Sequence, residues 1–204
     1  MTRFESTDPR TIGSLGIFGG TFDPIHLAHL ILAERAREEL ALDAVLFMPA
    51  LIPPHKGNGR RIAAPEHRVA MVERAIADNP GFLLSSHELD RGGVSYTVDT
   101  LLYLRRVCPD AALTLLIGGD SARDFHTWRE PERIAGLASI AVWARPEAEL
   151  PAEVIPGAGY RRIEAPLVGL SSTEIRDRVA RGRSIRYMTT DGVVEYIENH
   201  GLYR

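Results

Sequence analysis

A short apolar run that ends in two glycines constrains the fold of this chain more than any other feature. Residues 15–18 are apolar and few in number, which is typical of a buried parallel strand. Gly19 and Gly20 let the backbone turn sharply and let a large ligand come close to it. Asp23 and Pro24 then indicate a helix start, because aspartate caps free N–H groups and proline has no N–H to leave unpaired. The segment predicts a strand, a tight turn and a helix.

Two histidines, His26 and His29, follow this turn three residues apart. On a helix they share one face, close to the free N–H groups and the positive dipole end that favour an anion. The segment lacks the Gly-Lys-Ser/Thr of a Walker A loop and the Gly-x-Gly-x-x-Gly of a dinucleotide fingerprint. A zinc site would need further ligands, and two incidental histidines on a capped helix are the plain structural alternative. We interpret the segment as a phosphate site, because strand, glycines, cap and histidines agree on one geometry.

Length and composition bound the class of protein. The chain has 204 residues, 45% hydrophobic and 25% charged, which suits one soluble α/β domain. A net charge of −3 argues against nucleic acid or an acidic membrane surface as partner. Cys108 is the single cysteine, so no disulfide framework exists and a reducing cytoplasm is compatible. No apolar run approaches the ~20 residues of a membrane helix. Residues 1–14 are expected to be a flexible leader, and residues 15–204 the domain.

Strand-like and helix-like runs alternate along the chain. The expected strands are residues 15–18, 44–48, 82–85, 113–117, 140–144 and 161–164. The expected helices are residues 27–40, 65–78, 97–107, 131–137, 172–181 and 192–200. The alternation predicts a Rossmann-like, doubly wound parallel sheet with helices on both faces, in a single domain. Ligands of such folds bind at the carboxyl ends of the strands, so we expect the site there.

Polar residues follow the second and third expected strands. His55 and Lys56 stand in a proline-rich loop, residues 49–64, that is expected to be a mobile active-site element. Lys56 either meets a phosphate there or is an ordinary solvated lysine. Ser95 or Thr97 caps the helix that follows, and the same turn offers N–H groups to a carboxylate.

The fourth strand leads to an acid and an indole. Asp120 either accepts hydrogen bonds from ribose hydroxyls or caps a short helix. Trp128 either fills the core beneath its loop or stacks on a flat ligand, and both interpretations stay open on the residues alone. Trp143, inside the fifth strand, is expected in the core.

A second polar helix start follows the sixth strand. Ser171 and Glu174 form a capping-box pattern, which explains these residues structurally. The same run places hydroxyls, free N–H groups and Arg176 together, which suits a polyphosphate.

These segments resemble a known family. Gly-Gly-Thr-Phe-Asp-Pro-Ile-His-x-x-His, residues 19–29, is similar to the first signature of the nucleotidyltransferases that share the HxGH motif, with Ala28 in place of the usual glycine. Residues 170–176 resemble the second signature, Ile-Ser-Ser-Thr-x-Ile-Arg, with Leu170 for isoleucine. Pro-Pro-His-Lys, Ser-Tyr-Thr-x-Asp-Thr-Leu and the Gly-x-Asp then Trp-Arg order resemble segments of the bacterial nicotinate-mononucleotide adenylyltransferases.

The resemblance implies an enzyme of NAD biosynthesis that transfers the adenylyl group of ATP to nicotinate mononucleotide, forming nicotinate adenine dinucleotide and pyrophosphate. It implies Mg²⁺ held mainly by ATP phosphates, with no metal-ligating residues in the protein. His26 and His29 would be catalytic. Residues implied in ATP binding are Gly19, Gly20, Thr21, Phe22, His26, His29, Gly118, Asp120, Ser171, Ser172, Thr173 and Arg176. Residues implied in binding the mononucleotide are His55, Lys56, Tyr96, Thr97, Trp128, Arg129 and Arg145.

Two other functions are weighed against this one. A phosphopantetheine adenylyltransferase has a similar first signature, but its acceptor has no aromatic ring for Trp128 to meet. A non-catalytic nucleotide sensor usually carries a second binding domain, for which this chain has no spare length. ATP and the mononucleotide are the expected partners, without nucleic acid or membrane, and assembly into a homo-oligomer stays open.

Overall fold

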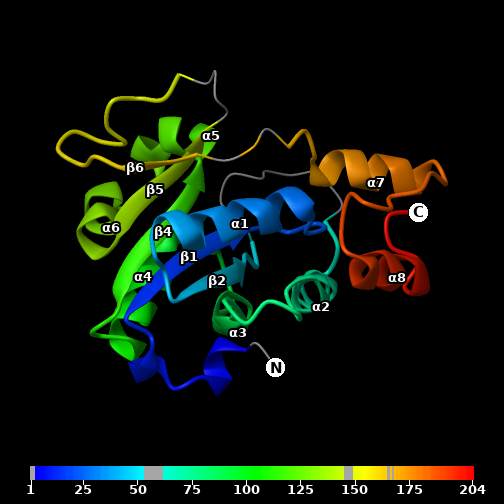
Figure 1. The fold of residues 1–204 in the computed structure, drawn as a ribbon, viewed down its shortest axis with the longest axis horizontal. Coiled ribbons are helices and arrows are strands. Elements are labelled where there is room, and N and C mark those ends of the chain that lie inside the picture. Colours follow the sequence, from blue (N-terminus) through cyan, green and yellow to red (C-terminus); the bar gives the residue numbers. More distant parts are fainter. Residues whose placement is uncertain (1–2, 53–61, 145–148, 165, 167) are drawn as a thin grey trace.

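One parallel sheet organises the part of the chain that the computed structural model describes, which is residues 3–52, 62–144, 149–164, 166 and 168–204 (Figure 1). Its strand order is β3-β2-β1-β4-β5-β6, and every neighbouring pair is parallel. The strands are β1 (Ser14–Gly20), β2 (Ala44–Pro49), β3 (Phe82–Leu84), β4 (Ala112–Gly118), β5 (Ser139–Ala144) and β6 (Arg161–Glu164). The predicted Rossmann-like, doubly wound sheet is therefore confirmed.

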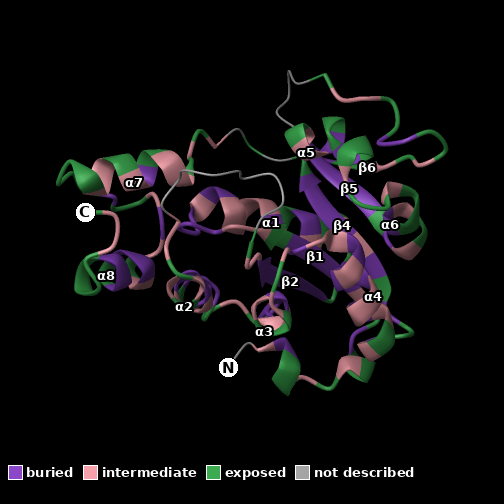
Figure 2. Ribbon diagram, turned by 180° about the vertical axis from the view of Figure 1, so that it is seen from behind, coloured by how far each residue is buried: buried purple, intermediate pink, exposed green. Residues whose placement is uncertain are grey.

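Helices connect the strands and cover both faces of the sheet (Figures 1 and 2). They are α1 (Leu27–Glu39), α2 (Pro65–Ala75), α3 (His87–Arg91), α4 (Thr97–Val107), α5 (Gly119–Arg123), α6 (Pro131–Leu137), α7 (Ser172–Ala180) and α8 (Asp191–Asn199). None of the helices in the described ranges is both long and apolar enough to cross a membrane.

The sheet separates two apolar cores because side chains alternate along each strand. Phe18 and Phe47 lie in the core shared with α1, α2 and α8. Ile17 and Leu46, their chain neighbours, lie in the core shared with α4 and α6. The direction of winding reverses between β1 and β4, and a ligand site is expected at such a switch point.

Residues 3–13, part of the segment 1–14 that the sequence predicted to be a flexible leader, contact the domain. Phe4 is 4% exposed and Ile12 is 7% exposed, and both belong to the second core. Glu5 accepts a hydrogen bond from Ser85 at 2.6 Å, and Arg3 pairs with Glu73 at 3.1 Å. Two single apolar residues in a polar stretch carry little periodic signal, so their burial depends on the sheet edge that they meet.

Candidate active site

The turn after β1 is closed on one side and open on the other. A Cβ at Gly20 would lie 2.7 Å from the Phe22 ring, whereas a Cβ at Gly19 would meet no described atom within 4 Å. Phe22 has a φ of 49° and is 2% exposed, so its ring belongs to the core. The open side at Gly19 is where a ligand can approach the backbone closely.

The predicted role of Asp23 as the helix cap is wrong. α1 begins at Leu27, and His26 is its N-cap residue. The Asp23 carboxylate instead accepts hydrogen bonds from the Tyr203 hydroxyl at 2.8 Å and the Ala63 N–H at 3.1 Å. At the start of α1, His29 takes the capping role instead, because its Nδ1 accepts the His26 N–H at 3.2 Å. Asp23 does not cap the helix, because its carboxylate is bound by donors from the distant residues Tyr203 and Ala63.

The two histidines form a stacked pair, as one face of a helix start predicts. Their ring centroids are 3.6 Å apart with an interplanar angle of 21°. His26 is 6% exposed, and its Nδ1 is buried with no hydrogen-bond partner among the described residues. Burial lowers the pKa of His26 to about 4, so its ring is neutral at pH 7. His29 Nδ1 accepts the hydrogen bond from the His26 N–H and therefore carries no proton. In a neutral His29 ring the proton is then on Nε2.

The start of α7 contacts the first signature directly. Ser171 caps α7 by accepting the Glu174 N–H at 3.2 Å, as predicted. The Ser172 hydroxyl donates to the Pro24 carbonyl at 2.9 Å. Arg176 donates to the Asp23 carbonyl at 2.6 Å and to the Thr173 hydroxyl at 3.2 Å. The two signatures, about 150 residues apart, therefore form one structure.

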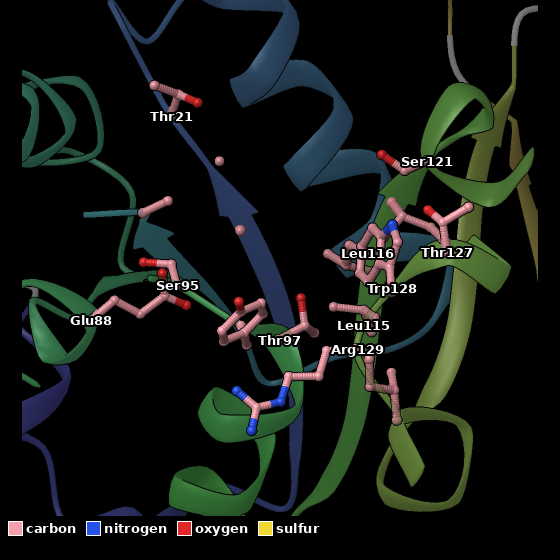
Figure 3. Close-up of a pocket in the computed structure, with 16 residues that line it drawn as sticks. Thr21, Glu88, Ser95, Thr97, Leu115, Leu116, Ser121, Thr127, Trp128 and Arg129 are labelled. Atoms are coloured by element: carbon pink, nitrogen blue, oxygen red, sulfur yellow. The ribbon is translucent and has the colours of Figure 1, made fainter. Parts of the chain in front are cut away.

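A cavity of about 440 Å³ lies between the glycine turn after β1 and the segments that follow β3 and β4 (Figure 3). Its volume is in the range of small-molecule sites. Four predicted residues of the mononucleotide site line it together with the turn after β1: Tyr96, Thr97, Trp128 and Arg129. The turn contributes Gly19, Gly20 and Thr21.

The structure gives each tryptophan a distinct place. Trp128 is half-buried, with its ring 5.1 Å from that of Phe125, so it packs on the core and also lines the cavity. The core packing that the sequence allowed is therefore present, and stacking on a flat ligand stays a prediction. Trp143 is 5% exposed and donates its indole N–H to the Leu32 carbonyl at 3.0 Å, which confirms it as a core residue.

Two charged residues line the cavity within the described ranges. The Arg129 guanidinium lies over the Tyr96 ring, 4.7 Å from its centroid, a cation–π contact that orients both side chains. Glu88 lies at the other side, 6% exposed, and accepts from the Thr100 hydroxyl at 2.5 Å. Burial raises the pKa of Glu88, while its bonds to Thr100 and Ser95 oppose that shift.

Glu88 and Arg68 were not expected near the site from the sequence. Arg68 is 1% exposed and donates to four backbone carbonyls. Two of them belong to Thr21 at 2.8 Å and Ala50 at 2.7 Å, and the others to Leu51 and Ala63. This guanidinium joins the turns after β1 and β2. A signal was present, because the i, i+3, i+4 spacing puts Arg68 on the apolar face of Met71 and Val72.

Other predicted residues lie apart from the cavity. Gly118 ends β4, and Asp120 is exposed on α5, where it pairs with Arg123. Neither lines the cavity. His55, Lys56 and Arg145 lie outside the described residues.

Fold and site together define the class. A parallel sheet in the order 3-2-1-4-5-6, with a glycine turn and a helix N-terminus at its switch point, is typical of α/β enzymes that bind nucleotides. Residues 17–178 match the family model described as cytidylyltransferase-like.

Known proteins narrow the class. A probable nicotinate-nucleotide adenylyltransferase of Thermomicrobium roseum is 50% identical over 196 residues, covering 93% of this chain and 91% of its own. A protein of the same description from Thermus thermophilus is 48% identical over 193 residues, covering 93% and 99%. The chain belongs to this family of nucleotidyltransferases, which confirms the resemblance found in the sequence.

A solved structure shares the fold. The Plasmodium falciparum nicotinic acid mononucleotide adenylyltransferase complexed with NaAD superposes with a TM-score of 0.76, covering 93% of this chain and 97% of its own. The sequence identity is 19%, so this likeness supports the architecture alone.

Proposed function

We propose that the protein transfers the adenylyl group of ATP to nicotinate mononucleotide, forming nicotinate adenine dinucleotide and pyrophosphate in NAD biosynthesis. The main observation behind the proposal is that one cavity is lined both by the glycine turn after β1 and by Tyr96, Thr97, Trp128 and Arg129. An aromatic wall suits a flat pyridine ring, and a glycine turn suits phosphates. The description of relatives about 50% identical supports the same substrates.

The reaction needs no protein nucleophile. An oxygen of the mononucleotide phosphate attacks the α-phosphorus of ATP, and the bond from that phosphorus to the bridging oxygen breaks, which releases pyrophosphate. A phosphate monoester is already anionic near pH 7, so catalysis consists of positioning and charge stabilisation. We assign His26 and His29 as donors to the α-phosphate oxygens. A neutral His29 donates through Nε2, and an arriving phosphate favours protonation of His26 beside it.

We assign the remaining parts of the site by position. The backbone of the turn would bind the nucleotide, with Gly19, Gly20, Thr21 and Phe22 contributing. Gly118 and Asp120 are proposed to contact the ribose of ATP, although they do not line the cavity. Ser171 and Thr173 would offer hydroxyls, and Ser172 would offer its backbone N–H at the start of α7, to the departing pyrophosphate, together with Arg176. His55, Lys56 and Arg145 are proposed to contact the mononucleotide phosphate.

We propose that Mg²⁺ is bound mainly through ATP phosphates. Mg²⁺ prefers oxygen ligands and commonly keeps phosphates and water around it. Across the described ranges, no group of three or more His, Cys, Asp or Glu side chains is placed to hold a metal ion. The ion would neutralise charge on the leaving pyrophosphate. The domain would comprise residues 15–204 with residues 3–13 packed against it. We place the reaction in the cytoplasm, which one buried cysteine suits, and leave homo-oligomers open.

Pyrophosphate release tests the function. The protein is incubated with ATP, Mg²⁺ and, one at a time, nicotinate mononucleotide, nicotinamide mononucleotide and 4′-phosphopantetheine, with parallel samples in excess chelator. We expect release with the pyridine mononucleotides alone, and its loss in chelator. Release with phosphopantetheine alone would identify the other adenylyltransferase class, and ATP binding without release would identify a sensor.

The same assay measures the preference for the acid. The turn at Thr97 and the Arg129 guanidinium favour a carboxylate, because charge-assisted hydrogen bonds are about twice as strong as neutral ones. An amide would leave a donor facing a donor, so we expect discrimination on the order of 10²-fold in kcat/KM. Comparable kcat/KM for both mononucleotides would show that the carboxylate pocket is misassigned.

A further inference from the structure

Asp23 lies where three distant segments meet. Its residue is 4% exposed, and its Oδ1 accepts from the Tyr203 hydroxyl at 2.8 Å and from the Ala63 N–H at 3.1 Å. Its Oδ2 lies 3.6 Å from a guanidinium nitrogen of Arg176. The glycine turn is thereby joined to the start of α2, to α7 and to the segment that follows α8.

The segment after α8 is held so that Tyr203 reaches Asp23. The Leu202 N–H donates to the Ile197 carbonyl at 3.1 Å, and Gly201 has a φ of +58°. Tyr203 has a φ of 64°, a left-handed conformation that bulky residues rarely adopt and that persists only where the surroundings impose it. Burial raises the pKa of Tyr203 above its usual value, so the hydroxyl stays protonated and donates.

Arg176 lies between Asp23 and the start of α7. Its side chain is 15% exposed, and it donates to the Asp23 carbonyl and to the Thr173 hydroxyl. The separation of 3.6 Å from Asp23 Oδ2 exceeds a hydrogen bond, so the ion pair is loose. A carboxylate that turned toward the guanidinium would form the closer pair that arginine favours. The two donors on Oδ1 oppose that rotation.

We infer that Tyr203 is a positioning residue for adenylyl transfer: its hydroxyl holds the Asp23 carboxylate in the orientation that leaves Arg176 for the pyrophosphate end of ATP. The inference rests on the proposed function. Without the hydroxyl, Oδ1 keeps the Ala63 N–H as its donor, and the carboxylate competes with the phosphates for the guanidinium.

The test is Tyr203→Phe, with Tyr160→Phe as the matched control. Tyr160 is half-buried like Tyr203, and its hydroxyl is likewise a donor. Its acceptor is the Pro151 carbonyl at 2.6 Å, and Tyr160 does not line the cavity. We expect Tyr203→Phe to raise the KM for ATP roughly tenfold, the scale of one charge-assisted hydrogen bond. The KM for pyrophosphate in the reverse reaction rises with it. The KM for nicotinate mononucleotide stays near parental, and Tyr160→Phe changes none of these KM values. The melting temperature of Tyr203→Phe falls by a few degrees, because the buried Asp23 carboxylate loses one donor.

A double-mutant cycle tests the route through Asp23. Asp23→Asn removes the charge that attracts Arg176, so adding Tyr203→Phe to it changes the KM for ATP less than twofold. Parental KM values for ATP and pyrophosphate in Tyr203→Phe overturn the inference, as does an equal rise in the KM of both substrates or an additive double mutant. A parent protein that transfers no adenylyl group contradicts the proposed function instead, and this is measured first.

Discussion

Gly19 and Gly20 are adjacent, yet replacing each with alanine should have opposite consequences. A Cβ at Gly20 would lie 2.7, 2.9 and 3.1 Å from three atoms of the Phe22 ring. A Cβ at Gly19 would point into the open side of the turn, with no described atom within 4 Å. Gly20→Ala therefore tests packing, and Gly19→Ala tests the approach of the nucleotide.

The magnitude for Gly20→Ala follows from how firmly the Phe22 ring is held. The ring must retreat by roughly 0.7 Å to restore an ordinary contact of about 3.4 Å. It is 2% exposed and lies 5.2 Å from His29, 5.5 Å from Phe18 and 5.7 Å from Phe47, centroid to centroid. Overpacking of this kind costs ~1–3 kcal/mol. At about 2–4 °C per kcal/mol for a chain of this size, the melting temperature should fall by roughly 2–12 °C.

Gly19→Ala should leave the melting temperature at or slightly above the parental value and raise the KM for ATP. A methyl group in the path of the ligand costs ~1 kcal/mol or more, which is about fivefold or more in KM. Both variants gain the same unfolded-state benefit from losing a glycine, so their difference isolates the native-state effect.

The assay combines thermal unfolding followed by circular dichroism with initial rates at saturating mononucleotide. Equal melting temperatures in the two variants would refute the packing argument. A parental KM for ATP in an active Gly19→Ala protein would show that the nucleotide does not approach the turn from this side.

Three further outcomes are expected. His29→Ala should lower kcat by about 10²–10³ with little change in the KM for ATP, as for loss of a transition-state donor worth ~2.7–4 kcal/mol; near-parental turnover would make this histidine structural. Trp128→Ala should raise the KM for the mononucleotide but not the KM for ATP, because at most ~1–3 kcal/mol of stacking is lost. The core control, Trp143→Ala, should instead lower the melting temperature. Weaker binding of both substrates in Trp128→Ala would show that Trp128 acts as a core residue. Since burial lowers the pKa of His26 to about 4 from the ordinary 6.5, the unfolded chain binds the proton first, and stability falls by up to about 3 kcal/mol as pH drops from 6.5 to 4. The free energy of unfolding, measured by urea denaturation at several pH values in this range, should change less with pH in His26→Asn than in the parent. An equal pH dependence in the two proteins would contradict the role of His26.

Local patterns in the sequence were sufficient for the fold class and for the two signatures. Alternating apolar runs predicted the strands, because the residues that form one strand or helix are neighbours in the chain. The Ser171 cap and the core position of Trp143 follow from equally local signals. The short helices α3 and α5 were missed, since five residues are too few to show a period.

Only the tertiary structure decided what the charged groups near the site do. Asp23 reads locally as a helix cap, but its carboxylate binds Tyr203, 180 residues away. Arg68 is buried on the apolar face of its helix, and its guanidinium joins the turns that follow β1 and β2 by donating hydrogen bonds to both. The reason is physical: a buried polar group must find its partners among the segments that the packed sheet brings to it, and chain neighbours do not reveal which segments those are.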